Sequence, residues 1–387
     1  MVGALALSLL CSLWLLSLLA NLKMVRSLSR LGDLELLPPP AWPKLSIVVP
    51  ACNEGETLGP ALTTLRALDY PNLEIVLIDD RSTDRTGQIM DEAREVDSRL
   101  TVIHLDRLPE GWLGKVHALD VGTKASSGEI ILFTDADVVF ARDALTRAVS
   151  YFEHRGLDHL CVVPDITSRS FVASTMIATA LRGIALSQRP WNTENPKKKE
   201  TIGGGAFNMV RRSFFEGTPG FEWLRLEVAD DIGLAHLMKQ SGGKPSVLIA
   251  GGLVAVEWYS SVWGAIRGME KNGFAQIARY SLARGLLLAA LMVGVGSAPF
   301  LAMAHPFDWV RIAGVTALLV GAANGVLLSR WMKTPLLPQL LASPVGDFLL
   351  AFLIVRSTVL GVARGGLIWR GTVYPTAELR KGVRIKF

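Results

Sequence analysis

Long apolar segments at both ends of the chain restrict its fold more than any other feature. Val2 to Ala20 carries no charged residue and has about the length that a helix needs to cross a bilayer. Leu286 to Ala304 and Ile312 to Ser329 are similar segments in the last third of the chain. These segments predict a membrane protein whose water-facing domain lies between its apolar ends.

A cleaved signal peptide is the alternative for the N-terminal segment. No basic residue precedes the apolar run and no small-x-small cleavage site follows it, so we expect an uncleaved transmembrane anchor over residues 1–22. Lys23, Arg26 and Arg30 come next, and the positive-inside rule therefore places the following domain in the cytosol. Residues 23–43 are predicted to be a basic, proline-rich linker, which its proline run stiffens.

The last apolar segment, Ser343 to Ala363, is harder to place. Asp347 and Arg356 interrupt it, and charged groups inside a span are costly. If all three later segments crossed the membrane, the basic tail 364–387 would lie outside, against the positive-inside rule. We therefore expect a re-entrant or interfacial hairpin here. The other predicted regions are a folded domain at 44–257, an interfacial amphipathic segment at 258–285 and C-terminal membrane segments at 286–363.

The composition agrees with this division. Half of the 387 residues are hydrophobic, and 40 basic against 35 acidic residues give a net charge of +5. A basic excess can indicate nucleic-acid binding, but here it lies beside apolar segments and favours contact with anionic lipid headgroups. The three cysteines are far apart and have neither zinc-site nor disulfide-framework spacing.

Between the apolar ends, short apolar runs alternate with helical patterns. Because parallel strands and helices alternate in this way, an α/β domain with a parallel sheet covered on both faces is predicted. Ligands bind such sheets at the carboxyl ends of the strands, so chemistry is expected just after residues 50, 78 and 134. The expected strands are 45–50, 73–78, 100–105 and 129–134, and the expected helices are 57–68, 83–96 and 115–124.

Two acidic pairs follow predicted strands. Asp79 and Asp80 could simply precede a helix cap, but adjacent carboxylates repel unless a cation or donor lies near, and a nucleoside offers donors. Asp135 and Asp137 could converge on one hard cation, whose preference for oxygen ligands also attracts phosphate. Two aspartates with this spacing recur by chance, but their place after a buried strand strengthens the metal interpretation.

A third acidic pair, Asp230 and Asp231, opens an apparent helix that runs to Gln240. Acids at a helix start can merely complement the helix dipole. Alternatively, one of them is a general base that removes a proton from an incoming hydroxyl. Considered together with the other two pairs, the general base is favoured.

The motifs together resemble family 2 glycosyltransferases with the GT-A fold. The resemblance covers residues 44–240 and rests on Val48-Val-Pro-Ala-Cys-Asn-Glu54, Ile78-Asp-Asp-Arg-Ser-Thr-Asp-Arg-Thr86, Asp135-Ala-Asp137 and Asp230-Asp231. Gly111-Trp-Leu-Gly-Lys115 and the terminal Trp369-Arg-Gly-Thr-Val-Tyr374 resemble the membrane subgroup of hopanoid-associated, carotenoid-acid and ceramide glycosyltransferases. The expected fold class is α/β: a GT-A (Rossmann-like) domain with one N-terminal transmembrane helix and a C-terminal membrane region of two to three hydrophobic segments.

The resemblance implies that the protein transfers a sugar with inversion in a single displacement. Asp231 would be the general base with Asp230 beside it, and Asp137, helped by Asp135, would hold Mg²⁺ or Mn²⁺ on the diphosphate. Lys115 would approach the donor phosphates, although an ordinary solvated lysine is the plainer interpretation. The donor, expected to be a UDP-sugar, would contact the remaining predicted residues: Pro50, Asn53, Glu54, Asp79, Asp80, Gly204 and Gly205.

A motif of many processive relatives, Gln-x-x-Arg-Trp after the base, is absent from this chain. Arg267 and Lys271 lie in its place, four residues apart and so on one helix face. They could contact the diphosphate, or they could be snorkelling cations on an interfacial helix. The missing motif favours single additions over polymer synthesis.

The apolar segments around the domain predict a lipid acceptor, hopanoid, isoprenoid or sphingoid-like. Phe171 to Leu186 is expected to be a core or interfacial helix, and Trp258 and Tyr259 are of types favoured at the headgroup level. A polyprenyl-phosphate acceptor and a non-catalytic nucleotide-sugar-binding scaffold are the alternatives. The predicted location is a bacterial-type inner membrane, crossed several times, with the catalytic domain in the cytoplasm and no nucleic-acid partner.

Overall fold

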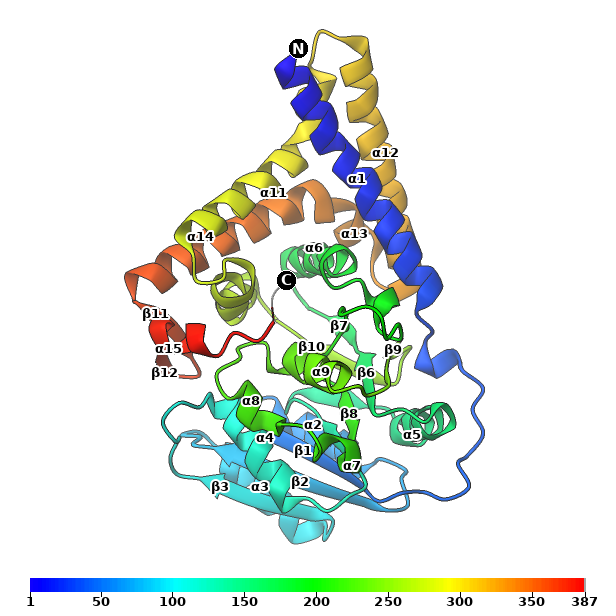
Figure 1. The fold of residues 1–387 in the computed structure, drawn as a ribbon, viewed down its shortest axis with the longest axis vertical. Coiled ribbons are helices and arrows are strands. Elements are labelled where there is room, and N and C mark those ends of the chain that lie inside the picture. Colours follow the sequence, from blue (N-terminus) through cyan, green and yellow to red (C-terminus); the bar gives the residue numbers. More distant parts are fainter. Residues whose placement is uncertain (386–387) are drawn as a thin grey trace.

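The computed structural model describes residues 1–385, in which helices rise from an α/β domain to a narrow apex (Figure 1). The α/β domain is built on a seven-stranded sheet of order β3-β2-β1-β4-β8-β6-β9. Strand β8 is antiparallel to β4 and β6, and the other pairs are parallel. The strands are β1 (Leu45–Ala51), β2 (Leu73–Asp80), β3 (Leu100–Leu105), β4 (Ile130–Phe133), β6 (His159–Val163), β8 (Asn208–Arg211) and β9 (Pro245–Ile249).

Helices cover both faces of this sheet, because successive residues of a strand point to opposite sides. Ile47 and Val49 of β1 pack with one group of helices, and Val48 packs with the other. The predicted α/β domain with a sheet covered on both faces is therefore confirmed, but the sheet is parallel only in part, because the unpredicted β8 runs antiparallel. The first group is α2 (Leu58–Arg66), α3 (Thr86–Val96) and α5 (Ala144–Arg155), and the second is α4 (Gly114–Ala125), α8 (Gly220–Leu224) and α9 (Asp230–Gln240), with the short α7 (Arg212–Phe215) after β8.

A small sheet of order β5-β10-β7 adjoins the main one. Strand β5 (Val138–Phe140) begins directly after Asp137, and β10 (Val254–Glu257) ends directly before Trp258. Strand β7 (Asp165–Thr167) leads toward the long helix α6 (Phe171–Gln188), whose start is capped by the Ser170 hydroxyl. The short helical turns of this region are η1 (Leu31–Asp33) and η2 (Pro190–Asn192).

Four helical stretches in the described residues are long and apolar enough to cross a membrane: Val2–Ser27, Leu282–Met303, Asp308–Met332 and Leu336–Ala363. They correspond to α1, α11, α12 and a broken fourth stretch, in which the π-helical segment η4 (Ala342–Gly346) separates α13 (Leu336–Leu341) from α14 (Asp347–Ala363). Helix α1 extends to Ser27, past the expected end of the anchor at residue 22, because Met24 and Leu28 remain buried against Leu328 and Ile249.

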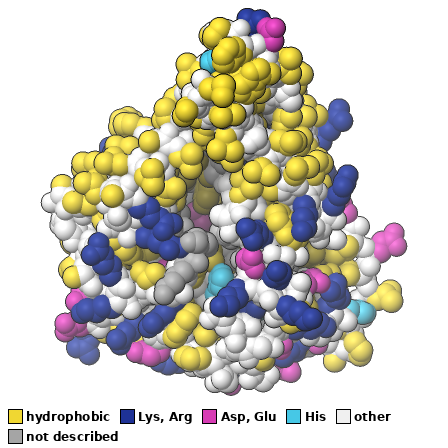
Figure 2. All heavy atoms as spheres, turned by 45° about the horizontal axis from the view of Figure 1, so that its top comes forward, with side chains coloured by type: hydrophobic (Ala, Val, Ile, Leu, Met, Phe, Trp, Pro, Cys, Tyr) yellow, Lys and Arg dark blue, Asp and Glu magenta, His cyan; other side chains and the backbone are white. Residues whose placement is uncertain are grey.

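The packing fixes which end of each membrane helix faces the α/β domain. Ala4 clusters with Ala302 and Val310, so the N-terminus and the α11–α12 turn lie together at the apex, far from the sheet (Figure 1). Helix α14 packs beside α11 through Leu350 and Ala289, and in Figure 1 it runs across α1 and α12 instead of along them. Figure 2 shows hydrophobic side chains covering the projecting helices, with Lys and Arg side chains gathered below them.

The chain returns to the α/β domain after α14. Strands β11 (Gly366–Trp369) and β12 (Thr372–Pro375) form an antiparallel hairpin, and α15 (Thr376–Lys381) follows. Leu367, Tyr374 and Leu379 are buried in the same core cluster as α4. Before the membrane helices, α10 (Val262–Gly268) and the π-helical η3 (Asn272–Ile277) occupy the predicted interfacial segment.

Candidate active site

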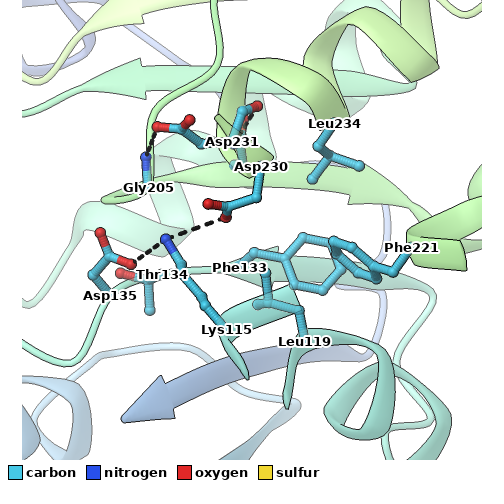
Figure 3. Close-up of a pocket in the computed structure, with 11 residues that line it drawn as sticks. Lys115, Leu119, Phe133, Thr134, Asp135, Gly205, Phe221, Asp230, Asp231 and Leu234 are labelled. Atoms are coloured by element: carbon cyan, nitrogen blue, oxygen red, sulfur yellow. Dashed lines mark hydrogen bonds and ion pairs between the residues drawn. The ribbon is translucent and has the colours of Figure 1, made fainter. Parts of the chain in front are cut away.

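The carboxyl ends of β1, β2 and β4 point to one edge of the sheet, where the start of α9 also lies. Ala51 of β1 is in register with Asp79 of β2, and Asp135 follows β4 closely. Three predicted motifs meet at this edge: the Asp135 motif, the Asp230-Asp231 pair and the glycine run 203–205. Ion pairs through Lys115 and a backbone hydrogen bond link them (Figure 3). The site is built from segments that are far apart in the sequence but adjacent in the sheet.

Lys115 joins two of these motifs. It lies in the first turn of α4, and its Nζ is 2.7 Å from Asp135 Oδ1 and 3.2 Å from Asp230 Oδ2 (Figure 3). Burial alone would lower the pKa of this ammonium, but Asp135 and Asp230 raise it above its usual range. Lys115 is therefore a cation fixed inside the acidic cluster, not a solvated surface lysine.

Asp231 differs from Asp230 in its partners. Its Oδ2 accepts a hydrogen bond from the Gly205 amide at 2.9 Å, and its Oδ1 accepts one from the Ile232 amide at 2.8 Å. Burial, together with the neighbouring Asp230 carboxylate, raises the pKa of Asp231 to about 6. Two hydrogen bonds therefore fix the Asp231 carboxylate, which has no paired cation among the described residues. A pKa of about 6 suits a general base that works near neutral pH.

The glycine run 203–205 allows the loop to pass close to both acidic motifs. A Cβ at Gly203 would lie 1.9 Å from the Asp231 carbonyl oxygen, and one at Gly205 would lie 2.4 Å from Asp135 Oδ2. At Gly204 the nearest atom would be Cys161 Sγ at 3.6 Å, which is an ordinary contact. Two of the three glycines are therefore required by close approach.

Asp137 has acidic neighbours and forms no ion pair among the described residues. Burial, followed by the repulsion of Asp135 and Glu54, raises the pKa of Asp137 to about 7. A divalent cation would relieve this repulsion, and carboxylate oxygens are ligands that Mg²⁺ and Mn²⁺ accept. Residues 1–385 contain no group of three acidic, His or Cys side chains placed to hold a metal by themselves, so phosphate and water oxygens would have to complete the coordination.

The predicted nucleoside contacts fall into two groups. Pro50, Glu54 and Asp80 line a large cavity at the sheet edge. Asp79 and Asn53 are not among its lining residues: Asp79 accepts a hydrogen bond from the Ser82 amide at 3.2 Å and contacts His104 Nδ1 at 3.0 Å.

Asn53 holds two loops together. Its φ of 56° is in the left-handed region, which asparagine tolerates better than most residues, and its Oδ1 accepts a hydrogen bond from the Thr83 amide at 2.8 Å. From the sequence, the adjacent Asp79 and Asp80 carboxylates are expected to repel each other. Arg81 offsets this repulsion within the protein, because its Nε lies 2.8 Å from Asp80 Oδ1.

Arg267 and Lys271, which share one face of the expected helix, have different surroundings. The Lys271 ammonium lies 3.7 Å from the centroid of the Trp369 ring, and burial lowers its pKa to about 8. Arg267 is exposed at the wall of the large cavity. Both residues line the cavity, Arg267 in the last turn of α10 and Lys271 directly before the π-helical η3.

Several residues that lie at the site were not among the site residues predicted from the sequence. Arg370 of the C-terminal hairpin pairs with Glu54, and Tyr374 accepts a hydrogen bond from the Gly114 amide at 3.1 Å. Tyr259 and Trp369 line the cavity. The sequence offered one indication of these contacts, the aromatic and basic residues of Trp369 to Tyr374, but no local pattern places that segment beside β1.

The cavity has a volume of about 1590 Å³ and connects the acidic cluster with the membrane helices. Glu54, Asp137 and Asp231 are among the residues that line it. Apolar residues of α11, α12 and α14 also line it, namely Leu288, Leu291, Met292, Leu328, Leu350 and Ile354, together with apolar residues of α6 and the small sheet. A single nucleotide-sugar would leave much of this space unfilled, because sites for small molecules usually measure about 300–1000 Å³.

Comparison with known families identifies the domain. Residues 46–218 match the model of Glycosyl transferase family 2. Beta-monoglucosyldiacylglycerol synthase of Synechocystis sp. is 35% identical over 123 residues, which cover 31% of this chain and 25% of that protein. The 4,4'-diaponeurosporenoate glycosyltransferase of Staphylococcus haemolyticus is 26% identical over 186 residues, which cover 46% of each chain.

A solved structure extends the likeness beyond the family domain. The mannosyltransferase PcManGT from Pyrobaculum calidifontis, solved with GDP-Man and Mn²⁺, superposes with a TM-score of 0.54 at 18% identity, covering 92% of this chain and 98% of that one. At this identity the similarity concerns the fold. The chain spans a quarter to just under half of the length of the first curated relatives it matches.

Proposed function

We propose that the family 2 glycosyltransferase domain of this chain transfers a sugar from a nucleotide-sugar to a membrane lipid. One observation carries the proposal: a single cavity is lined both by the acidic cluster and by apolar side chains of candidate membrane spans. A lipid could present its hydroxyl to the acids while its tail stays among apolar side chains. Leaving that environment would cost about 0.8 kcal/mol for each CH₂ exposed to water.

The donor would be bound at the β1–β2 edge. Glu54 and Asp80 line the cavity there and could accept hydrogen bonds from the base and the ribose. Asp137 and Asp135 would hold Mg²⁺ or Mn²⁺, which, when bound, neutralises the charge that develops on the diphosphate. A UDP-sugar is our first choice of donor, and GDP-sugars are the alternative to test.

Asp231 would act as the general base. Lys115 binds Asp230 and Asp135, which leaves Asp231 free to accept a proton. Gly205 and Ile232 donate to the Asp231 carboxylate and hold it in place. The acceptor hydroxyl would lose its proton to Asp231 while its oxygen attacks the anomeric carbon, and the nucleoside diphosphate would leave from the opposite side. This single displacement inverts the anomeric centre.

The packing of the helices supports a cytoplasmic catalytic domain. Lys23 and Arg26 follow the apolar part of α1 on the side of the α/β domain, as the positive-inside rule requires. The basic tail lies on the same side, because its hairpin packs on α4. In this topology α1, α11 and α12 cross the membrane and the broken α13–α14 stretch does not. The basic tail then agrees with the positive-inside rule.

The relatives favour a lipid acceptor. Two of the proteins reported above are named for a diacylglycerol lipid and a carotenoid acid. The cavity wall also contains Trp258 and Tyr259, whose rings suit the depth of the headgroups. A neutral acceptor gives an uncharged glycolipid and a polyprenyl phosphate gives an anionic one. The charge of the labelled lipid product therefore distinguishes the two acceptors.

The test is to incubate membranes containing the full chain with labelled UDP-sugars and GDP-sugars and to identify labelled lipids by mass spectrometry. We expect a new glycolipid with the wild type. Asp231→Asn should lower its formation by about 100-fold or more, since a general base contributes about 10²–10⁴ in rate. The exposed Asp69→Asn is the matched control. Normal turnover by Asp231→Asn would refute the mechanism, and the absence of any labelled lipid with the wild type would refute the function.

A further inference from the structure

We propose that the C-terminal hairpin β11–β12 is part of the donor site and that the Arg370 guanidinium binds the diphosphate of the nucleotide-sugar. This inference rests on the proposed function and adds a binding element from outside the family 2 domain. The hairpin begins almost 150 residues after residue 218, where the match to the family model ends.

Arg370 occupies the position that such a role requires. Its guanidinium pairs with Glu54, which is 316 residues earlier in the chain and lies just after β1. Arg370 and Trp369 line the same cavity as Asp80, Asp135 and Asp137. The guanidinium is also near enough to lower the pKa of the buried Asp135, although Lys115 has the larger effect.

The hairpin is anchored, so the position of Arg370 is defined before any ligand binds. Tyr374 accepts a hydrogen bond from the Gly114 amide at 3.1 Å, one residue before Lys115. Leu367 and Tyr374 are buried with α4 in one core cluster. Such preorganisation lowers the entropy lost when a ligand is bound.

The turn of the hairpin does not explain why an arginine stands at this position. Trp369 pairs with Thr372, so Arg370 and Gly371 form a two-residue turn with φ of 48° and 78°. Such turns favour asparagine followed by glycine, and a long side chain in the left-handed region is unfavourable. The guanidinium, and not the turn, is therefore the feature that needs a function.

The charges at the site leave Arg370 available for an anion. Lys115 is enclosed by Asp135 and Asp230, and the Lys271 ammonium lies over the Trp369 ring. The Arg370 side chain is 48% exposed and has Glu54 as its acidic partner. A guanidinium matches two phosphate oxygens with parallel hydrogen bonds, so a diphosphate can replace the Glu54 carboxylate as its partner.

The experiment measures binding of UDP and of GDP, each with Mn²⁺, to the detergent-solubilised full chain by calorimetry. Uridine and guanosine, which lack phosphate, are measured in parallel. Arg370→Asn is the informative variant, because asparagine keeps the turn and removes the guanidinium. Arg370→Lys restores the charge without the planar fork. Lys381→Ala removes a cation from the same tail that pairs with Glu378 and is the matched control.

We expect Arg370→Asn to weaken nucleoside diphosphate binding by about 10-fold or more, the range of a hydrogen bond to a charged group. Nucleoside binding should be unchanged, Arg370→Lys should be intermediate, and Lys381→Ala should match the wild type. Equal diphosphate affinity in Arg370→Asn and the wild type would overturn the inference. Equal losses of nucleoside and diphosphate binding would overturn it too, because they would assign Arg370 a structural role. A wild type that binds neither diphosphate would instead contradict the proposed function.

Discussion

The pKa of Asp231 is raised and the pKa of Lys271 is lowered. Together these two shifts predict how sugar transfer depends on pH. Burial and Asp230 raise the pKa of Asp231 to about 6, whereas burial, followed by Lys115, lowers the pKa of Lys271 to about 8. Below pH 6 Asp231 is protonated and cannot accept a proton. Above pH 8 Lys271, which also lines the cavity, loses its positive charge, so the cavity attracts the donor phosphates less strongly. We expect kcat/KM to fall on both sides of a maximum near pH 7.

This pH profile has an internal control. Lys271→Arg keeps a cation at this position to much higher pH, because the guanidinium is not deprotonated in proteins. The acid limb should then remain and the alkaline limb should disappear from a plot of kcat/KM measured from pH 5 to pH 9. An unchanged alkaline limb would assign that limb to another group.

Asp137 predicts how the metal depends on pH. Its pKa is raised to about 7, so metal binding must displace a proton in much of the population below that pH. As the pH rises toward 7, we expect the Mn²⁺-dependent part of UDP binding to strengthen about 10-fold per pH unit. Above pH 7 it should level off. Asp137→Ala should bind UDP equally with Mn²⁺ and with chelator. A metal response that survives in this variant would exclude Asp137 as a ligand.

At the scale of elements, the glycine run 203–205 allows a matched pair of substitutions, one at a crowded glycine and one at its uncrowded neighbour. Gly203→Ala would force a Cβ to 1.9 Å from the Asp231 carbonyl oxygen, whereas Gly204→Ala would place one 3.6 Å from the nearest atom. We expect Gly203→Ala to lower transfer by about 10-fold or more, because a displaced Asp231 loses its alignment with the acceptor. Gly204→Ala should have a much smaller effect. Initial rates of glycolipid formation check this, and equal effects of the two variants would contradict the close-approach explanation.

At the scale of the whole molecule, the packing of the helices predicts the sidedness of the chain. Ala4, Ala302 and Val310 meet at the apex, while Leu367 and Leu379 pack in the α/β domain. A cysteine introduced at His305 should react with a membrane-impermeant maleimide added to intact cells. A cysteine at Lys381 should react only after permeabilisation. Labelling of both positions in intact cells would show that α13–α14 crosses the membrane.

Local patterns were sufficient for much of the fold. The strand Leu100 to Leu105 has the predicted bounds, and Leu73 to Asp80 extends its prediction by two residues. For Leu73 to Asp80 the reason is burial, because a strand buried on both faces needs apolar side chains on both. The acids after residues 78 and 134 were found for a related reason: in a parallel sheet the carboxyl ends of strands share one edge.

The sequence by itself therefore determined the membrane helices, the parallel-rich sheet and the edge at which its acids gather, since each depends on hydrophobic period and strand direction within a few residues. The tertiary structure alone decided that Lys115 binds Asp135 and Asp230, that Asp79 contacts His104 and does not line the cavity, and that Arg370 reaches Glu54. These contacts depend on how segments up to 316 residues apart pack, and no periodicity within one segment encodes the position of another.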